Sequence, residues 1–260
     1  MTRQLGQSRS VAQEDRRLWQ TRVLLMLGLL LGWQVLSLFG SKFWMSSPVA
    51  VAQQLWRWIA DGSLFFHVWA TVQAAGYGYL IGTVLGCLTG LILGLMPRVD
   101  RIFQPFIIAL YSLPKIALAP VFVILFGIEL SSKVILVAIT VFFLLLFSTR
   151  DGVRDVDQEL IVAVKLMGAS QIELAQKILL PASMPWIFSG LRLSVRYAFT
   201  AAILAEFIAA NEGLGFLIEH SAVEFNTTGV FAALTVLVML SVLINELLAR
   251  GESSALGWRV

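Results

Sequence analysis

Long, almost uninterrupted apolar stretches dominate the chain. They cover six regions: 22–40, 68–96, 105–127, 132–149, 185–210 and 229–248. A helix needs ~20 apolar residues to cross the hydrocarbon core of a bilayer, so each region is long enough or nearly so. Sustained alternation of apolar and polar positions, which is typical of barrel strands, does not occur. The pattern predicts an all-α membrane protein with about six transmembrane helices.

A shorter amphipathic stretch, "SPVAVAQQLWRWIADG", lies between the first two apolar regions. Its apolar positions Val51, Leu55, Trp58 and Ile59 share one helical face. The stretch is too short and too polar to cross a bilayer, which indicates a helix lying in the membrane interface.

Lysine and arginine are unevenly divided between the two sides of these spans. Thirteen fall on one side: Arg3, Arg9, Arg16, Arg17, Arg22, Arg98, Arg101, Arg150, Arg154, Lys165, Lys177, Arg250 and Arg259. Three fall on the other: Lys42, Arg57 and Lys133. Because loops rich in lysine and arginine stay in the cytoplasm, both termini and the loop at 150–181 are predicted to be cytoplasmic.

The chain therefore divides into four parts. Residues 1–21 form a polar cytoplasmic tail, too long and too acidic for the start of a cleaved signal peptide. Residues 22–64 hold the first span and the periplasmic interfacial helix. Residues 65–248 form a core of five spans that includes the cytoplasmic loop 150–181. Residues 249–260 form a second cytoplasmic tail.

Composition agrees with the membrane class and narrows the chemistry. Hydrophobic residues make up 58% and charged residues 13% of the chain, about half the charge of a soluble domain. A lone cysteine, Cys87, excludes a disulfide framework, and no metal-ligand spacing occurs; the histidines, His67 and His220, are far apart. The net charge of +3 follows from the loop bias and gives no reason to expect nucleic-acid binding.

The second span carries a glycine at every fourth position. The five glycines are Gly78, Gly82, Gly86, Gly90 and Gly94. This spacing puts them on one stripe, where the backbone of a second helix can approach closely. Tight packing is one interpretation, and a helix that slides against its neighbour is the other. Cys87 lies beside the stripe as a small hydrophobic residue.

The third span contains the segment "SLPKIALAP". Pro114 and Pro120 each lack a backbone donor and are predicted to bend the helix. Lys115 lies between them, at a depth where a charge costs a few kcal/mol. Its side chain is expected either to face protein, water or a solute pathway, or to reach a lipid headgroup.

The fifth span carries three charged residues. Arg192 and Arg196 are four residues apart and share a face. Arg192 can reach the cytoplasm, whereas Arg196 lies near the midplane and is expected to face inward, where it could contact an anion. Glu206 lies near the outer end. Together with Pro114, Lys115 and Pro120, these residues are the candidates for a translocation pathway.

The loop 150–181 reads as two short amphipathic helices. Asp157 is a good N-cap for the first, and Gly168 is typical of a helix end. Ser170 and Glu173 have the spacing of a capping box, and Pro181 is expected to stop the second helix. The predicted apolar positions are Leu160, Ile161, Val164 and Met167 in the first helix and Ile172, Ala175, Ile178 and Leu179 in the second. Such a pair could dock into a partner's groove or lie on the bilayer.

This loop resembles the cytoplasmic loop of permease subunits of bacterial ABC importers. That motif is E-A-A, three residues, glycine, nine residues and I-x-L-P. Gly168 is followed by nine residues and then by Ile178, Leu179, Leu180 and Pro181. Ala163 matches the first half, whereas Val162 and Val164 depart from it. The residues that the resemblance assigns to coupling with an ATPase are Ala163, Val164, Gly168, Ala169, Ser170, Glu173, Ile178, Leu180 and Pro181.

Segments such as "SLPKIALAPVFVILFGI" and "GLGFLI" extend the resemblance to the nitrate/sulfonate/taurine branch of these permeases over roughly 65–220. The resemblance implies a type I importer permease that forms a homodimer or heterodimer. Its expected partners are two ATP-binding subunits and a periplasmic or lipid-anchored solute-binding protein. It also implies ATP and Mg on those subunits, no cofactor on this chain, and a small anion such as a sulfonate, taurine, nitrate or bicarbonate as the solute.

Other classes explain the sequence less well. No G-x-x-x-x-G-K-[ST] motif occurs, so ATP would have to be handled by a partner. A secondary transporter or a channel not driven by ATP is the alternative, but acidic relay residues are scarce in the spans and no internal repeat is visible. An intramembrane enzyme would need a nucleophile–base pair or metal ligands at membrane depth, and the sequence offers neither.

Overall fold

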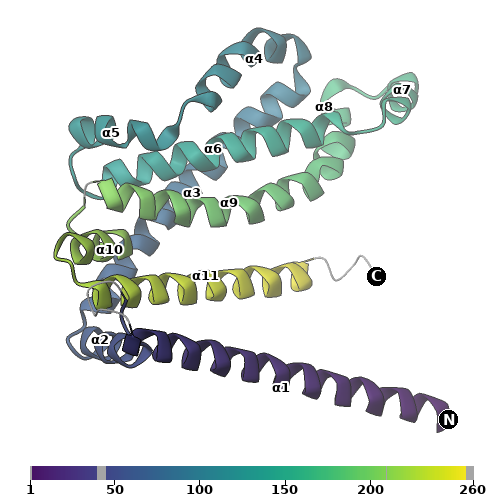
Figure 1. The fold of residues 1–260 in the computed structure, drawn as a ribbon. Helices are drawn as coiled ribbons and strands as arrows, with labels where there is room; N and C mark the ends of the chain where they lie inside the picture. Colours follow the sequence, from purple (N-terminus) through teal and green to yellow (C-terminus); the bar gives the residue numbers. More distant parts are fainter. Residues whose placement is uncertain (1, 40–44, 209, 256–260) are drawn as a thin grey trace.

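The computed structural model describes residues 2–39, 45–208 and 210–255, which form helices joined by short turns (Figure 1). In chain order the helices are α1 (Thr2–Phe39), α2 (Pro48–Ala60), α3 (Ser63–Leu95), α4 (Pro97–Ser112), η1 (Lys115–Leu118), α5 (Ala119–Phe126), α6 (Leu130–Arg154), α7 (Gln158–Leu166), α8 (Gln171–Leu174), η2 (Ala175–Leu179), α9 (Leu180–Ile208), α10 (Leu214–Val223) and α11 (Thr227–Ala255). Lys42 and the last five residues of the predicted C-terminal tail lie outside the described residues.

The observed helices match the predicted spans closely. Among the described residues, five helices are long and apolar enough to cross a membrane, or six if the bent pair of α4 and η1–α5 is one span. The start of α1, the end of α11 and the α7–α8 segment lie at the same end of the long helices, here named the α7 end (Figure 1). The opposite end carries α2 and α10 and is named the α10 end. This arrangement agrees with termini and loop on one side of a membrane.

Three long helices, α3, α6 and α9, form the centre of the bundle. Mostly small and β-branched side chains fill the space between them. The buried residues there are Ala74, Ala75, Val137, Val141, Leu145, Ala198, Ala201 and Ala202. Because lipid tails are as apolar as these side chains, close packing rather than water exclusion holds such helices together.

The glycine stripe of α3 lies directly against α6. A Cβ atom built on Gly82 would stand 2.5 Å from the carbonyl oxygen of Ala138, and one on Gly86 would stand 2.6 Å from that of Phe142. The same holds one turn further on, at Gly90. Main-chain atoms of α6 therefore occupy the space that side chains on this stripe would need.

The predicted third span is broken rather than continuous. The axes of α4 and of the following η1–α5 segment differ by 80°. The break falls at Leu113 and Pro114, as the proline predicts. The expectation that Pro120 bends the helix is wrong. Pro120 lies in the first turn of α5, where a backbone N–H has no acceptor within the helix, so a proline removes no helical hydrogen bond.

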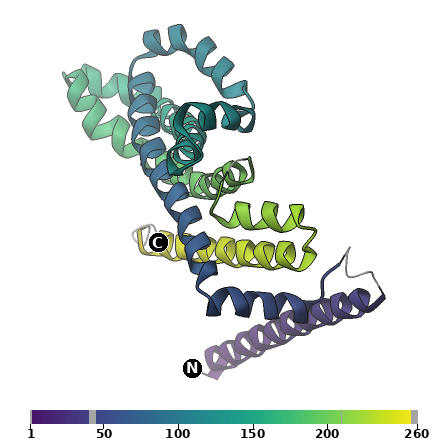
Figure 2. The same cartoon turned by 90° about the vertical axis from the view of Figure 1, so that its left-hand side faces the viewer.

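A smaller unit packs at the α10 end. Buried Leu214, Leu217 and Ile218 of α10 meet Ala233 and Val236 of α11. Figures 1 and 2 show α10 alongside α11, on the side away from α1. From α2, Leu55 and Trp58 pack onto this cluster and Val51 is buried, whereas the predicted face member Ile59 is 43% exposed.

Helix α1 is attached only lightly to the rest of the chain. Its apolar segment Leu18–Phe39 has no buried residue. Near the α10 end, the Trp33 indole N–H donates to the carbonyl oxygen of Ser46 at 2.8 Å, and its ring lies 5.5 Å from that of Phe231. Most of the apolar surface of α1 is thus available to lipid or to another protein.

Replacing Gly86 by leucine is expected to disrupt folding, because the new side chain must push two helix backbones apart. The cost should exceed the ~1–3 kcal/mol of ordinary overpacking, since main-chain atoms cannot move aside like a side chain. The amount of inserted protein and its thermal unfolding in detergent measure the effect.

Two controls separate this clash from a general intolerance of change in α3. Gly76 lies on the same helix, and no atom of another described segment lies within 4 Å of a Cβ built on it, so Gly76→Leu should be tolerated. Cys87→Ala should be near neutral, because Cys87 is only partly buried beside the stripe. Normal yield and stability of Gly86→Leu would show that α3 and α6 do not meet along the glycines.

Candidate functional site

The segment between α6 and α9 forms the predicted helix–turn–helix. The Asp157 carboxylate accepts the N–H of Glu159 at 2.8 Å and caps α7. Gly168 follows with a φ of +87°, in the left-handed region. The Gly168 N–H bonds to the carbonyl of Lys165, and the Ala169 N–H bonds to that of Val164. This pair of bonds is a Schellman motif, which explains the glycine.

The second half begins with the predicted capping box. The Glu173 N–H donates to the Ser170 hydroxyl at 3.2 Å, and the Ser170 N–H donates to the Glu173 carboxylate at 3.1 Å. Lys177 forms an exposed ion pair with Glu173 at 3.0 Å. These local contacts order the segment without help from a partner.

The prediction that Pro181 stops the second helix is wrong. Helical residues continue from α8 through η2, which is a π-helical turn, into α9. In this turn the Leu180 N–H bonds to the carbonyl of Ala175, five residues back. The wider turn shifts the bonding register, so Pro181 falls in the first turn of α9, where its missing N–H is tolerated.

Part of the apolar surface of this loop faces the membrane helices. Leu174 and Leu179 are buried with Val153 and Val156, and Ile161, Val164 and Ile178 pack against them together with Leu91 of α3. The predicted faces are therefore only partly correct. Leu174 was not expected on the buried face, because the π turn changes the helical phase. Met167 and Ile172, expected on apolar faces, are 85% and 68% exposed.

The remaining apolar side chains form a tip that this chain leaves uncovered. Its members are Leu160, Val162, Leu166, Met167 and Ile172, all exposed. Among the residues that the family motif singles out, Ala163, Gly168, Ser170, Glu173 and Pro181 are exposed, and Val164, Ala169, Ile178 and Leu180 are half-buried. We call the five exposed apolar residues, from Leu160 to Ile172, the loop tip.

A charge cluster joins three helices next to this loop. Asp100 of α4 is 1% exposed, and its carboxylate lies 2.8 Å from Arg154 and 3.6 Å from Arg150 of α6. Arg154 also donates to the carbonyl of Leu93 in α3 at 3.4 Å. The sequence did not point to Asp100, and the two arginines served only to predict which loops are cytoplasmic. An acid in the first turn of a helix that enters the membrane was the available signal.

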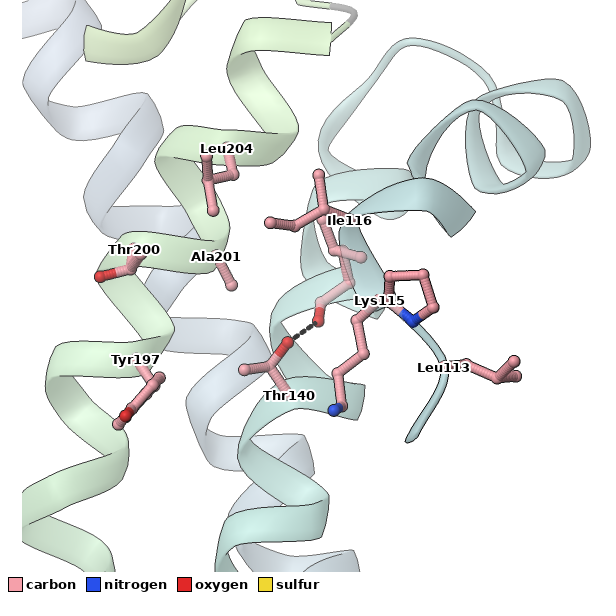
Figure 3. A pocket seen from close by; sticks show the side chains of 10 residues that line it. Leu113, Lys115, Ile116, Thr140, Tyr197, Thr200, Ala201 and Leu204 are labelled. Atoms are coloured by element: carbon pink, nitrogen blue, oxygen red, sulfur yellow. Dashed lines mark hydrogen bonds between the residues drawn. The ribbon is translucent and has the colours of Figure 1, made fainter. Parts of the chain in front are cut away.

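A cavity of about 310 Å³ opens between α6, α9 and the broken segment around Pro114 (Figure 3). Its lining residues are Leu113, Pro114, Lys115, Ile116, Leu136, Thr140, Tyr197, Thr200, Ala201 and Leu204. Thr140 lies ~15 Å of helical rise from the start of α6 and ~21 Å from its end, so the cavity sits near mid-depth. Of the six predicted pathway residues, two line it, namely Pro114 and Lys115.

Arg196 lines an adjoining cavity of about 280 Å³. The two cavities share Tyr197 and Thr200 as lining residues, which brings the two cationic candidates to one region of the bundle. Arg192 is half-buried one turn below Arg196, and neither it nor Pro120 lines either cavity. The structure adds three residues to the candidate pathway, namely Tyr197, Thr200 and Thr140. No sequence motif marked them.

Glu206 has a different setting at the α10 end. It is 1% exposed, lines neither cavity, and its carboxylate accepts the hydroxyl of Thr71 at 3.0 Å and the N–H of Gly215 at 2.8 Å. The Thr71 hydroxyl oxygen accepts the Leu214 N–H at 2.9 Å. Sequence reasoning identified the acid but not this partner.

His67 completes the same arrangement. Its Nδ1 accepts the N–H of Gly213 at 3.1 Å, so three consecutive amides at the start of α10 are bound by side chains of α3 and α9. Gly213 offers no side-chain cap of its own, and these contacts take its place. His67 and Thr71 are four residues apart on one helix, which was the only signal in the sequence.

Comparisons with known proteins agree with this architecture. The family described as binding-protein-dependent transport system inner membrane component matches residues 82–251. The formylaminopyrimidine transport permease protein of Halalkalibacterium halodurans is 30% identical over 91% of this chain and 94% of its own. The putative aliphatic sulfonates transport permease protein of Bacillus subtilis is 28% identical over 93% of this chain and 88% of its own.

Among solved structures, an inward-facing conformation of the MetNI methionine ABC transporter matches with a TM-score of 0.62 and 20% identity, over 71% of this chain and 92% of that one. It supports the type I importer fold alone. With the family match, the relatives and the multiple apolar helices, the chain belongs to the binding-protein-dependent transport system inner membrane component family, as a multi-pass permease subunit of an ABC importer rather than an enzyme.

Proposed function

We propose that this permease subunit imports a small organic or inorganic anion by alternating access, driven by ATP hydrolysis on partner subunits. The observation that carries the ATP-driven part is the loop tip, an ordered apolar surface outside the membrane helices. Exposed apolar side chains that cluster on a rigid scaffold are typical of docking sites. The ATP and Mg would be bound by those partners, because this sequence has no P-loop motif.

The expected assembly follows from the family. Two permease chains, identical or different, would pair with two ATP-binding subunits on the side of the α7 end. Lysine and arginine dominate that side, which supports a cytoplasmic position for it and for both termini. A periplasmic or lipid-anchored solute-binding protein would deliver the solute at the α10 end.

Cationic side chains near mid-depth support an anionic solute. Lys115 and Arg196 line adjoining cavities, and a charge at this depth is costly unless a polar or anionic partner meets it. The Bacillus subtilis relative is named for aliphatic sulfonates, whereas the Halalkalibacterium relative is named for formylaminopyrimidine. Sulfonates, taurine, nitrate and bicarbonate are the anions to test.

Uptake by the reconstituted complex tests the substrate class. Proteoliposomes that contain the permease, its ATPase and its binding protein should accumulate at least one of ethanesulfonate, taurine, nitrate and bicarbonate when ATP is supplied. Formylaminopyrimidine serves as the uncharged comparison. Uptake of that compound with no uptake of any anion would contradict the proposal of an anionic solute and would still agree with an ATP-driven importer.

Replacing Gly168 by leucine is expected to uncouple the permease from its ATPase. The left-handed position costs a side chain ~1–2 kcal/mol, and the new side chain would also project from the turn beside the loop tip. Space is available at this turn, because among the described residues, chain neighbours apart, no atom lies within 4 Å of a Cβ built on Gly168. Insertion should therefore survive, while co-purification of the ATPase and transport both fall.

Gly62 provides a matched control for backbone strain. It also has a positive φ, +78°, and open space around a built Cβ, but it lies at the α10 end, before α3. Gly62→Leu should lower stability by a similar amount and leave ATPase binding unchanged. If Gly168→Leu keeps its ATPase and normal transport, the loop only rests on the membrane surface.

A further inference from the structure

The cavity beside Pro114 holds an ammonium group whose hydrogen-bonding capacity is largely unused. Lys115 Nζ donates to the carbonyl of Tyr111 at 3.1 Å and lies 4.3 Å from the centre of the Tyr111 ring. The Phe143 ring is 5.3 Å away. An ammonium carries three donors, and within the described part of the chain no carboxylate forms an ion pair with this one. The aromatic rings partly offset the charge, but two donors remain for a solute or for water.

The opposite wall supplies one further donor. Figure 3 shows Tyr197 on α9 and Lys115 on the broken segment on opposite sides of the cavity, with Thr140 between them. The hydroxyls of Thr140 and Thr200 donate to carbonyls of their own helices, at 2.8 and 3.0 Å. Tyr197 is 47% exposed and lines the cavity, and its phenol carries one donor. Lys115 and Tyr197 thus bring donors from two segments to the lining of one cavity.

The rest of the cavity is apolar. The remaining lining residues are apolar: Leu113, Pro114, Ile116, Leu136, Ala201 and Leu204. Among the described residues that line the cavity none is acidic. A zwitterion such as taurine would bring an ammonium group with no carboxylate to receive it. The volume lies at the lower end of the ~300–1,000 Å³ of small-molecule cavities. These features favour a small organic anion with an apolar portion.

We propose that this cavity is a subsite on the solute's route, in which the head of an organic anion lies between Lys115 and Tyr197 and its apolar part lies against Ile116 and Leu204. The inference rests on the proposed import function and narrows its substrate to organic anions without a cationic group, such as alkanesulfonates. It assigns a specificity role to Tyr197.

A single introduced thiol tests the site without any transported substrate. Thr200→Cys in a Cys87→Ala background leaves one cysteine, at the cavity. In membrane vesicles carrying the assembled transporter, 2-sulfonatoethyl methanethiosulfonate should modify it faster than the trimethylammonioethyl reagent, once each rate is divided by the rate of that reagent with a free thiol in solution. Adding Lys115→Gln should slow the sulfonate reagent about tenfold without slowing the cationic one, because the attraction comes from the ammonium.

Arg57→Gln is the matched control, because Arg57 is an exposed cation on α2, outside both cavities. It should change neither rate. Equal normalised rates for the two reagents, no modification at all, or indifference to Lys115→Gln would each overturn the proposal. If Thr200→Cys does not insert, Thr140→Cys lines the same cavity and is read in the same way.

Transport gives a second measurement. Tyr197→Phe removes only the hydroxyl and should lower the maximal rate of ethanesulfonate uptake about tenfold, the size expected for one lost hydrogen bond to a charged group. The half-saturating concentration should not change if the binding protein sets it. An unchanged rate would exclude the phenol from the route. Should ethanesulfonate fail as a solute, the proposed substrate class fails, and the reagent rates alone still decide whether the cavity receives anions.

Discussion

The direct contact between the backbones of α3 and α6 is the constraint on which the other elements depend. Glycines on α3 let main-chain atoms of the two helices meet over several turns, so the pair acts as a rigid spine. Helix α9 packs onto both members, and the broken segment around Pro114 packs onto α6. At the α7 end, Val153 of α6 and Leu91 of α3 hold the helix–turn–helix. The mid-depth cavity and the loop tip are therefore both positioned by the α3–α6 pair.

Features set by neighbouring residues were predictable from sequence alone. Long apolar runs predicted the spans, and Gly168 and the Ser170–Glu173 pair predicted the turn because their hydrogen bonds are local. Features set by distant residues were not predictable. The partner of Asp100 lies 54 positions away, at Arg154, and a mid-helix π turn gives no sequence signal strong enough to reveal that Leu174 rather than Ile172 is buried. The cavity likewise needs three segments to meet before its shape exists.

Four ionisable side chains within the helical bundle offset the cost of their burial in four different ways. Asp100 pairs with arginines, Lys133 meets the carbonyl and carboxylate of Glu212, and Glu206 takes up backbone and hydroxyl donors. Each of these three is 1% exposed and ties its helix to a segment distant in the chain. Lys115 differs, because aromatic rings and one carbonyl are its recorded contacts. The first three residues hold the fold together, and the contrast marks Lys115 as the one with capacity left for something outside the chain.

The π turn makes α8, η2 and α9 a single helical stretch from Gln171 to Ile208, and this continuity has a mechanical consequence. Near its far end the stretch is tethered through Glu206 to the start of α10, while its near end carries Ile172 of the loop tip. By helical rise, Tyr197 stands ~14 Å from Glu206 and the loop tip ~50 Å from it. If the stretch tilts as a rigid body about this tether, residues near the tether move less than residues at the loop tip. A displacement of several ångströms at the loop tip would become a shift of about a quarter of that size beside the cavity. Such a shift is enough to open or close a contact there but too small to separate the packed helices.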